Sequence, residues 1–181
     1  MEKINKIKRV VLATAGEYLT YNGNIIDAFF FSTSVGYTEN SEDVFLNQVP
    51  YLRSVKSEWD NVSPVFSSKV TYNIYEFYLK LGLDYSDKID VSIIDTTSTG
   101  RIKNLKINGV VFSGVDVRNK LNLKSNYFNI VQNDDEVIIN TKGYGHGVGL
   151  SQYGADAMGK LGFKYDEILK YYYQGVVLEK L

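Results

Sequence analysis

The sequence of 181 residues has no cysteine, one histidine, one tryptophan and two prolines. Without cysteine the chain forms no disulfide and has no thiolate chemistry, and one histidine alone cannot build the usual structural zinc site. We therefore expect no metal and no cofactor. No apolar run reaches the length of a membrane span or of a signal-peptide core, although the first nine residues are basic.

Strong charge of either sign is also missing. The net charge of −1 offers no basic surface for nucleic acid, so we expect no nucleic-acid partner. Hydrophobic residues make up 44% of the chain and charged residues 23%, which is ordinary for a globular protein. The length suffices for one real core. Residues 1–181 are therefore expected to form a single soluble domain.

Glycine and tyrosine are abundant, with 15 of each. Five glycines and the only histidine fall within Lys142–Ala155, between the strand-like residues Glu136–Thr141 and a helix expected at Gln152–Lys160 with Ser151 as its N-cap. Glycines this dense mark a loop where the main chain comes close to something. One interpretation is a phosphate cradle, but the spacing fits neither a Walker loop nor a dinucleotide loop. The other is a tightly packed loop that holds His146 in a hydrogen bond.

Tyrosine has an apolar ring and a polar tip, which suits a groove for sugars. Tyrosines at the edge of an ordinary core have the same character. The tyrosine content alone therefore leaves both interpretations open.

Local patterns predict an α+β fold with antiparallel hairpins, a mixed sheet and several short helices. Asn-Gly turns predict two hairpins, which join these strands: Glu17–Tyr21 with Asn24–Phe31, and Ile102–Ile107 with Val110–Phe112. Other strands are expected at Ile89–Asp95, Tyr127–Val131, Glu136–Asn140 and Val176–Leu178. Asn73 and Glu76 form a predicted capping box for a helix that ends near Gly82, and Val115–Leu121 is expected to be a short helix.

The run Gly-His-Gly-Val-Gly-Leu-Ser-Gln-Tyr-Gly-Ala resembles the C-terminal motif of the stage II sporulation protein D and LytB family. Further blocks resemble the family in the same order along the chain: Gly16–Gly23, Ala28–Val44, Pro50–Val55, more weakly Gly114–Ser125, and Gly162–Gly175. The resemblance covers nearly the whole chain.

The resemblance implies a role in sporulation, because intact members resemble membrane-anchored lytic transglycosylases of engulfment. Such enzymes cleave the bond between N-acetylmuramic acid and N-acetylglucosamine, preferring strands without stem peptides. The presumed acid of the family is a glutamate in an upstream Glu-Met-Pro-type motif. This motif is missing here, since Pro50 and Pro64 follow Val49 and Ser63.

We therefore expect an N-terminally truncated piece of the family domain that is inactive alone and exposes apolar surface where the missing segment would pack. The full-length parent is expected to be anchored in the membrane and extracytoplasmic, in the space between forespore and mother cell. Its expected partners are peptidoglycan glycan strands and other engulfment proteins.

A lytic transglycosylase needs only one carboxylic acid, so the rest of its site must hold the glycan and stabilise developing charge. The resemblance assigns this role to the following substrate-binding residues: Ser32, Ser34, Thr38, Glu39, Asn40, His146, Ser151, Gln152 and Tyr153. If the chain were complete, Glu39 would be the candidate acid. Ser34 could equally cap the next turn, and His146 could contact a muramoyl carboxylate or only orient its loop.

Two other functions are consistent with the same residues. Part of the family resembles amidase enhancers, which would bind wall glycan or an autolysin without cutting. A purely structural protein of the sporulation envelope is a third interpretation. The absence of the acid motif fits the enhancer as well as it fits a truncated enzyme.

Overall fold

A computed structural model describes residues 2–181. Its helices are α1 (Glu2–Ala13), α2 (Ile74–Leu81), α3 (Gly114–Lys120), α4 (Gln152–Lys160) and α5 (Tyr165–Tyr172), with 3-10 turns η1 (Ser41–Asp43) and η2 (Glu58–Val62). Its strands up to residue 73 are β1 (Glu17–Tyr21), β2 (Asn24–Ile25), β3 (Phe30–Phe31), β4 (Gly36–Tyr37), β5 (Lys56–Ser57) and β6 (Ser67–Asn73). The remaining strands are β7 (Val91–Thr96), β8 (Ile102–Ile107), β9 (Val110–Ser113), β10 (Phe128–Asn133), β11 (Glu136–Lys142), β12 (Leu150–Ser151) and β13 (Val177–Lys180).

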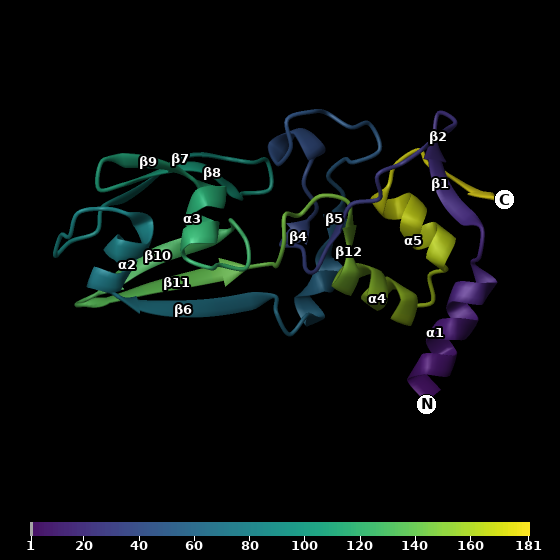
Figure 1. The fold of residues 1–181 in the computed structure, drawn as a ribbon, viewed down its shortest axis with the longest axis horizontal. Helices are drawn as coiled ribbons and strands as arrows, with labels where there is room; N and C mark the ends of the chain where they lie inside the picture. The colour runs from purple at the N-terminus through teal and green to yellow at the C-terminus, as the bar shows by residue number, and fades with distance from the viewer. Residues whose placement is uncertain (1) are drawn as a thin grey trace.

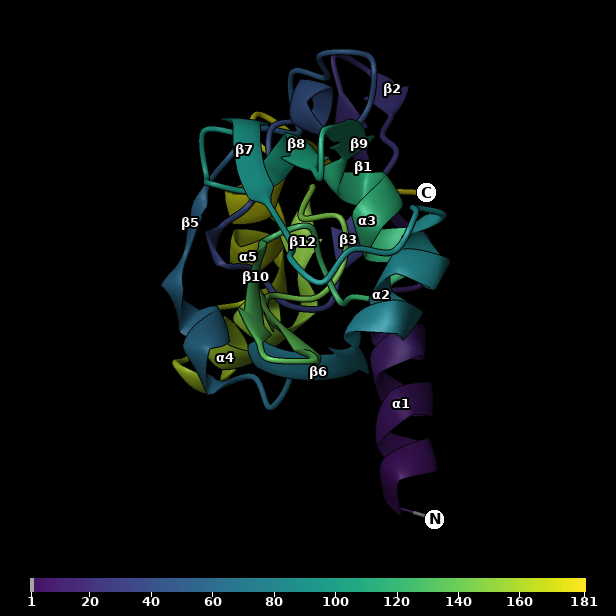
Figure 2. The same ribbon diagram turned by 90° about the vertical axis from the view of Figure 1, so that its left-hand side faces the viewer.

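Residues 67–142, the middle of the sequence, form one end of the elongated molecule (Figure 1). We call this end the central lobe after its place in the sequence. It contains two antiparallel sheets with the strand orders β10-β11-β6 and β7-β8-β9. Helices α2 and α3 lie to one side of both sheets (Figure 2). The core of this lobe comes from all of these elements, through buried residues such as Phe77, Leu105, Val117, Leu121 and Ile139. Burial of this apolar surface is its main source of stability.

Residues 14–66 and 143–181 form the terminal lobe at the other end (Figure 1). Its sheet has the order β13-β1-β2, and β4 pairs with β5. Strand β3 pairs with β12 in parallel, with Phe30 opposite Leu150. Two buried clusters stabilise this lobe, one around Leu52 and Val148 and one around Met158 and Tyr172. The α+β fold that the sequence predicts is thus confirmed, with the parallel pair β3-β12 as a sheet of its own.

Helix α1 extends away from both lobes (Figures 1 and 2). Its apolar side chains are between 52% and 76% exposed, and they are Ile4, Ile7, Val10, Val11 and Leu12. None of the helices in residues 2–181 is both long and apolar enough to cross a membrane.

Several local predictions are confirmed to the residue. Helix α4 spans Gln152–Lys160, and Ser151 caps it by accepting a hydrogen bond from the Gly154 N–H. Strand β8 spans Ile102–Ile107, and the turn at Asn108 joins it to β9. Asn108 has a φ of 46°, a value that this turn type requires. The other predicted strands and α3 begin or end within one or two residues of the expected positions.

Two local predictions are wrong. The second strand of the first hairpin is only Asn24–Ile25, because Phe30–Phe31 separates from it and pairs with β12 instead. Asn73 does cap α2, but its side chain accepts from the Tyr75 N–H and no capping box forms. The Glu76 side chain instead forms an ion pair with Lys80 one helical turn later, with Oε1 3.5 Å from Nζ.

Candidate functional site

The family motifs meet in space although they lie more than a hundred residues apart in the sequence. The loop that follows β11, residues 143–149, lies directly on residues 29–39. Thr33 and Tyr144 exchange two backbone hydrogen bonds of 3.0 and 2.9 Å, and the Glu39 N–H donates to Gly147 O at 2.8 Å. The block Ala28–Val44, which we call the first motif, and the glycine-rich stretch Lys142–Ala155, which we call the glycine motif, therefore form one structural unit.

Close approach explains the alternating glycines of this loop. Gly143, Gly145, Gly147 and Gly149 all have φ between 72° and 107°, which is the region that other residues resist. A Cβ at Gly145 would lie 2.8 Å from the Phe31 Cβ, and one at Gly149 would lie 2.1 Å from a backbone oxygen. Any side chain at these positions would push the two motifs apart.

Backbone amides of the loop donate within the protein. The Gly143 N–H donates to Phe66 O at 2.8 Å, and the Gly145 N–H donates to Lys124 O at 3.0 Å. A phosphate cradle needs amides that converge on the ligand. The structure therefore supports the packing interpretation of this loop over the anion cradle.

His146 sits in an aromatic cage with both ring nitrogens engaged. Its Nδ1 accepts from the Val148 N–H at 3.1 Å, so Nε2 carries the proton and donates to Phe30 O at 3.1 Å. The rings of Phe29, Phe31 and Phe45 surround it at centroid distances of 5.8 to 6.3 Å. Burial lowers the pKa of His146 below 6.5. This geometry suits the role of orienting the loop.

Glu39 and Arg101 form a buried ion pair between the two lobes. Both side chains are fully buried, and Arg101 Nε lies 3.2 Å from Glu39 Oε1, close enough for an ion pair though not aligned as a hydrogen bond. Thr99 donates its hydroxyl to the same carboxylate oxygen, and Arg101 Nη1 donates to Gly145 O at 3.0 Å. Burial lowers the pKa of Arg101 to about 10, and the charge of Glu39 opposes this shift. Glu39 has no exposed surface through which to reach a glycan in this conformation.

A second buried carboxylate, Asp60 on η2, holds the terminal lobe together. It accepts from the Ser34 N–H and hydroxyl at 2.9 Å each, from the Ser57 hydroxyl at 2.6 Å and from the Ser151 hydroxyl. Ser57 is also hydrogen-bonded to the Tyr172 hydroxyl at 2.7 Å. Sequence reasoning missed Asp60 because it lies outside the matched motifs, and no local pattern marks an acid as buried.

The nine predicted substrate-binding residues divide by exposure. Four are buried, namely Ser34, Thr38, Glu39 and Ser151. The other five are at least partly exposed: Ser32, Asn40, His146, Gln152 and Tyr153. Asn40 Oδ1 accepts from the Ser54 N–H at 2.9 Å, so part of this side chain is also used internally.

Exposed residues of both motifs lie together along β3 and the start of α4. Phe30 and Ser32 alternate with buried Phe31, so both face outward. The Tyr153 N–H donates to Ser32 O at 3.1 Å, and Gln152 next to it is exposed. We call Phe30, Ser32, Gln152 and Tyr153 the seam. It combines aromatic rings with a hydroxyl and an amide.

The acids of the first motif are all paired with cations. Besides Glu39, Glu42 accepts from Arg53 Nη1 at 2.7 Å, and Asp43 Oδ1 lies 2.6 Å from Lys103 Nζ. The hydrogen bonds from Arg53 lower the pKa of Glu42 to about 2. Within residues 2–181, no three His, Cys, Asp or Glu side chains gather closely enough to hold a metal ion.

Known proteins similar to this chain include stage II sporulation protein D of Bacillus subtilis (strain 168). It is 44% identical over 179 residues, which are 98% of this chain and 52% of that protein. The protein of the same name from Bacillus amyloliquefaciens is 43% identical over 97% of this chain and 51% of its own length. The chain is a relative of stage II sporulation protein D. This similarity over nearly the whole chain agrees with the resemblance seen in the sequence.

A more distant similarity is to an amidase enhancer. The amidase enhancer of Bacillus subtilis (strain 168) is 27% identical over 226 residues, which cover 94% of this chain and 32% of that protein. No protein-family model matches the chain. The chain spans about half the length of the two stage II sporulation protein D relatives.

Proposed function

We propose that this chain supplies the glycan-holding part of a peptidoglycan lytic transglycosylase that acts on the cell wall during engulfment. The relatives named for sporulation, together with the amidase enhancer, support a wall-related role in that process. The observation that carries the proposal is the seam, where exposed residues of two distant motifs meet on a scaffold of buried hydrogen bonds and one buried ion pair. We place its action outside the cytoplasm, where peptidoglycan lies.

The seam has the chemistry that sugar rings need. Phe30 is 59% exposed and Tyr153 is half-buried, so both offer ring surface to the apolar C–H face of a sugar. The Ser32 hydroxyl and the Gln152 amide can donate to and accept from sugar hydroxyls and N-acetyl groups. Rigid support beneath such residues lets them hold a glycan in one orientation.

The proton donor of the reaction is assigned to a different part of the intact protein. Cleavage needs a carboxylic acid within reach of the glycosidic oxygen, usually in apolar surroundings that raise its pKa. Glu39, Glu42 and Asp43 each contact a cation instead. A carboxyl with a pKa near 2, as at Glu42, holds no proton to give at neutral pH.

Binding to peptidoglycan tests this proposal. Sacculi stripped of stem peptides by an amidase should sediment the chain, and Tyr153→Ala should weaken binding about fivefold. Tyr75→Ala is the matched control, because Tyr75 is an exposed tyrosine on α2 far from the seam. Circular dichroism checks that both variants are folded. Equal binding by the two variants would remove the seam from the function.

A digest tests the assignment of the acid. The chain alone should release no anhydromuropeptides from the same sacculi, while a muramidase run in parallel releases soluble fragments. Cleavage by the chain that Glu39→Gln abolishes would make Glu39 the acid and overturn the holding role.

A second candidate function is that of an amidase enhancer, which binds wall glycan and stimulates another enzyme. The pairing of all three motif acids and the similarity to the amidase enhancer favour it. Addition of the chain to a wall amidase distinguishes the two functions. Faster release of stem peptides supports the enhancer, and an unchanged rate supports the transglycosylase.

A further inference from the structure

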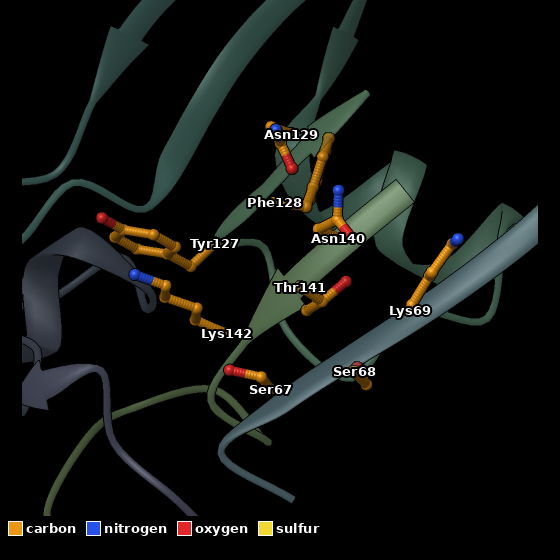
Figure 3. Close-up of a pocket in the computed structure, with 9 residues that line it drawn as sticks. All are labelled: Ser67, Ser68, Lys69, Tyr127, Phe128, Asn129, Asn140, Thr141 and Lys142. Atoms are coloured by element: carbon orange, nitrogen blue, oxygen red, sulfur yellow. The ribbon is translucent and has the colours of Figure 1, made fainter. Parts of the chain in front are cut away.

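A cleft of about 560 Å³ lies on the β10-β11-β6 sheet of the central lobe (Figure 3). Its lining consists of Ser67, Ser68, Lys69, Tyr127, Phe128, Asn129, Asn140, Thr141 and Lys142. A volume of this size is typical of sites for small molecules, which range from about 300 to 1,000 Å³. None of these residues belongs to the seam, and Lys142 directly precedes the glycine loop of residues 143–149.

Strand register places the cleft on the outer face of the sheet. Asn129 lies opposite Asn140, which lies opposite Lys69, and Lys142 lies opposite Ser67. Because side chains alternate along a strand, these two rows share one face. The row between them faces the core, with Phe128 and Thr141 buried, and no residue of α2, α3 or the other sheet lines the cleft.

Two lysines give the cleft its charge. Neither Lys69 nor Lys142 forms an ion pair within residues 2–181, whereas eight other ion pairs are formed there. Figure 3 shows Lys142 extending toward the Tyr127 ring at one end, with Lys69 on β6 at the other. The acid on the same face, Glu136, is four residues from Asn140 along β11, roughly 13 Å away. The cleft is therefore locally positive in a chain whose net charge is −1.

We propose that this cleft binds an acidic sugar, whose carboxylate is attracted by the lysines at the two ends, with the Tyr127 ring and the paired asparagines on the pyranose and its N-acetyl group. Ammonium groups form charge-assisted hydrogen bonds to carboxylates. Asparagine amides can donate and accept at once, as an N-acetyl group requires. In a peptidoglycan strand, the sugar with these features is N-acetylmuramic acid whose lactyl carboxylate carries no peptide.

This site deepens the proposed function, on which it rests. A glycan held at the seam and also on the sheet would contact both lobes. The preference expected for strands without stem peptides would then have a physical cause, since a stem peptide removes the carboxylate charge by forming an amide.

Two-dimensional NMR of the folded chain tests the proposal with three probes: denuded glycan strands, neutral chitotetraose and inorganic phosphate. Denuded strands should shift the amide signals of Asn129 and Asn140, with chitotetraose about tenfold weaker at this site. Lys69→Gln combined with Lys142→Gln should bring the two sugars to equal affinity. Lys106→Gln is the matched control, because Lys106 is an exposed lysine of β8 outside the cleft.

Each outcome is decisive. Shifts at the seam alone would overturn the acidic-sugar site and leave the proposed function standing. Shifts at neither surface would overturn both. Equal affinity of the unaltered cleft for the two sugars would overturn the role of the lysines, and equal shifts with phosphate would show a general anion site that does not recognise sugar.

Discussion

Gly147 shows how little space separates the glycine loop from the buried ion pair. Its φ is 92°, and a Cβ would lie 2.7 Å from Glu39 Cγ and 3.0 Å from Arg101 Cζ. We predict that Gly147→Ala lowers the free energy of unfolding by about 2–4 kcal/mol, from backbone strain and overpacking together. Urea unfolding of the two proteins measures this difference in the free energy of unfolding. Gly159→Ala is the control, because Gly159 lies in α4 with open space around it, and should stabilise by about 0.5–1 kcal/mol.

Four buried hydrogen bonds of the terminal lobe converge on the Asp60 carboxylate. Asp60→Asn would replace one accepting oxygen by an NH2 group that only donates, facing the Ser34, Ser57 and Ser151 donors. We predict a loss of about 3 kcal/mol in thermal unfolding experiments. Asp156→Asn, which breaks only an exposed pair with Lys160, should change stability little. Similar losses in the two variants would show that the Asp60 network contributes nothing.

The only histidine gives the chain a pH dependence of known sign. Burial holds the pKa of folded His146 below 6.5, so the unfolded chain binds more protons as the pH falls below that value. We therefore predict that the free energy of unfolding decreases from about pH 7 to pH 5.5. His146→Phe removes the titrating group and keeps a ring in the cage, so its stability should vary less over this range. A steeper profile in the variant would contradict the assignment.

At the scale of elements, α3 and α4 offer a comparison of two serine caps. Ser113 accepts from the Asp116 N–H at 2.9 Å near the surface, whereas Ser151 caps α4 and also donates to buried Asp60. We predict that Ser113→Ala costs about 1 kcal/mol and Ser151→Ala about 2–3 kcal/mol, measured by urea unfolding. Equal costs would mean that the hydrogen bond to Asp60 adds nothing to the cap.

At the scale of the whole molecule, two ion pairs join the lobes through β8 and the residue before it. Arg101→Met should cost about 3–5 kcal/mol, because it leaves the Glu39 charge buried without a cation. Lys103→Met breaks the partly exposed pair with Asp43 and should cost much less. A double-mutant cycle of Arg101→Met with Glu39→Gln checks the reason: the double variant should cost less than the sum. Additive costs would contradict a direct coupling.

Predictions from the sequence succeeded where the signal is local. The Asn108-Gly109 turn, the extent of β8 and the Ser151 cap depend on residues a few positions apart, and the structure confirms each. The prediction of the first hairpin is wrong because its second strand depends on a distant partner. Phe30 and Phe31 read as a continuation of β2, but their partner is β12, more than a hundred residues away.

The sequence by itself determined the fold class, the local turns and caps, and the resemblance to the family. Turns and caps depend on neighbouring residues, and composition and motif order can be read directly from the chain. Only the tertiary structure decided which motif residues face solvent. Ser34 and Glu39 are polar residues in a motif, yet Asp60 and Arg101 enclose them. Burying a charge or a hydroxyl is stable only when a distant partner satisfies it, and such partners are chosen by packing.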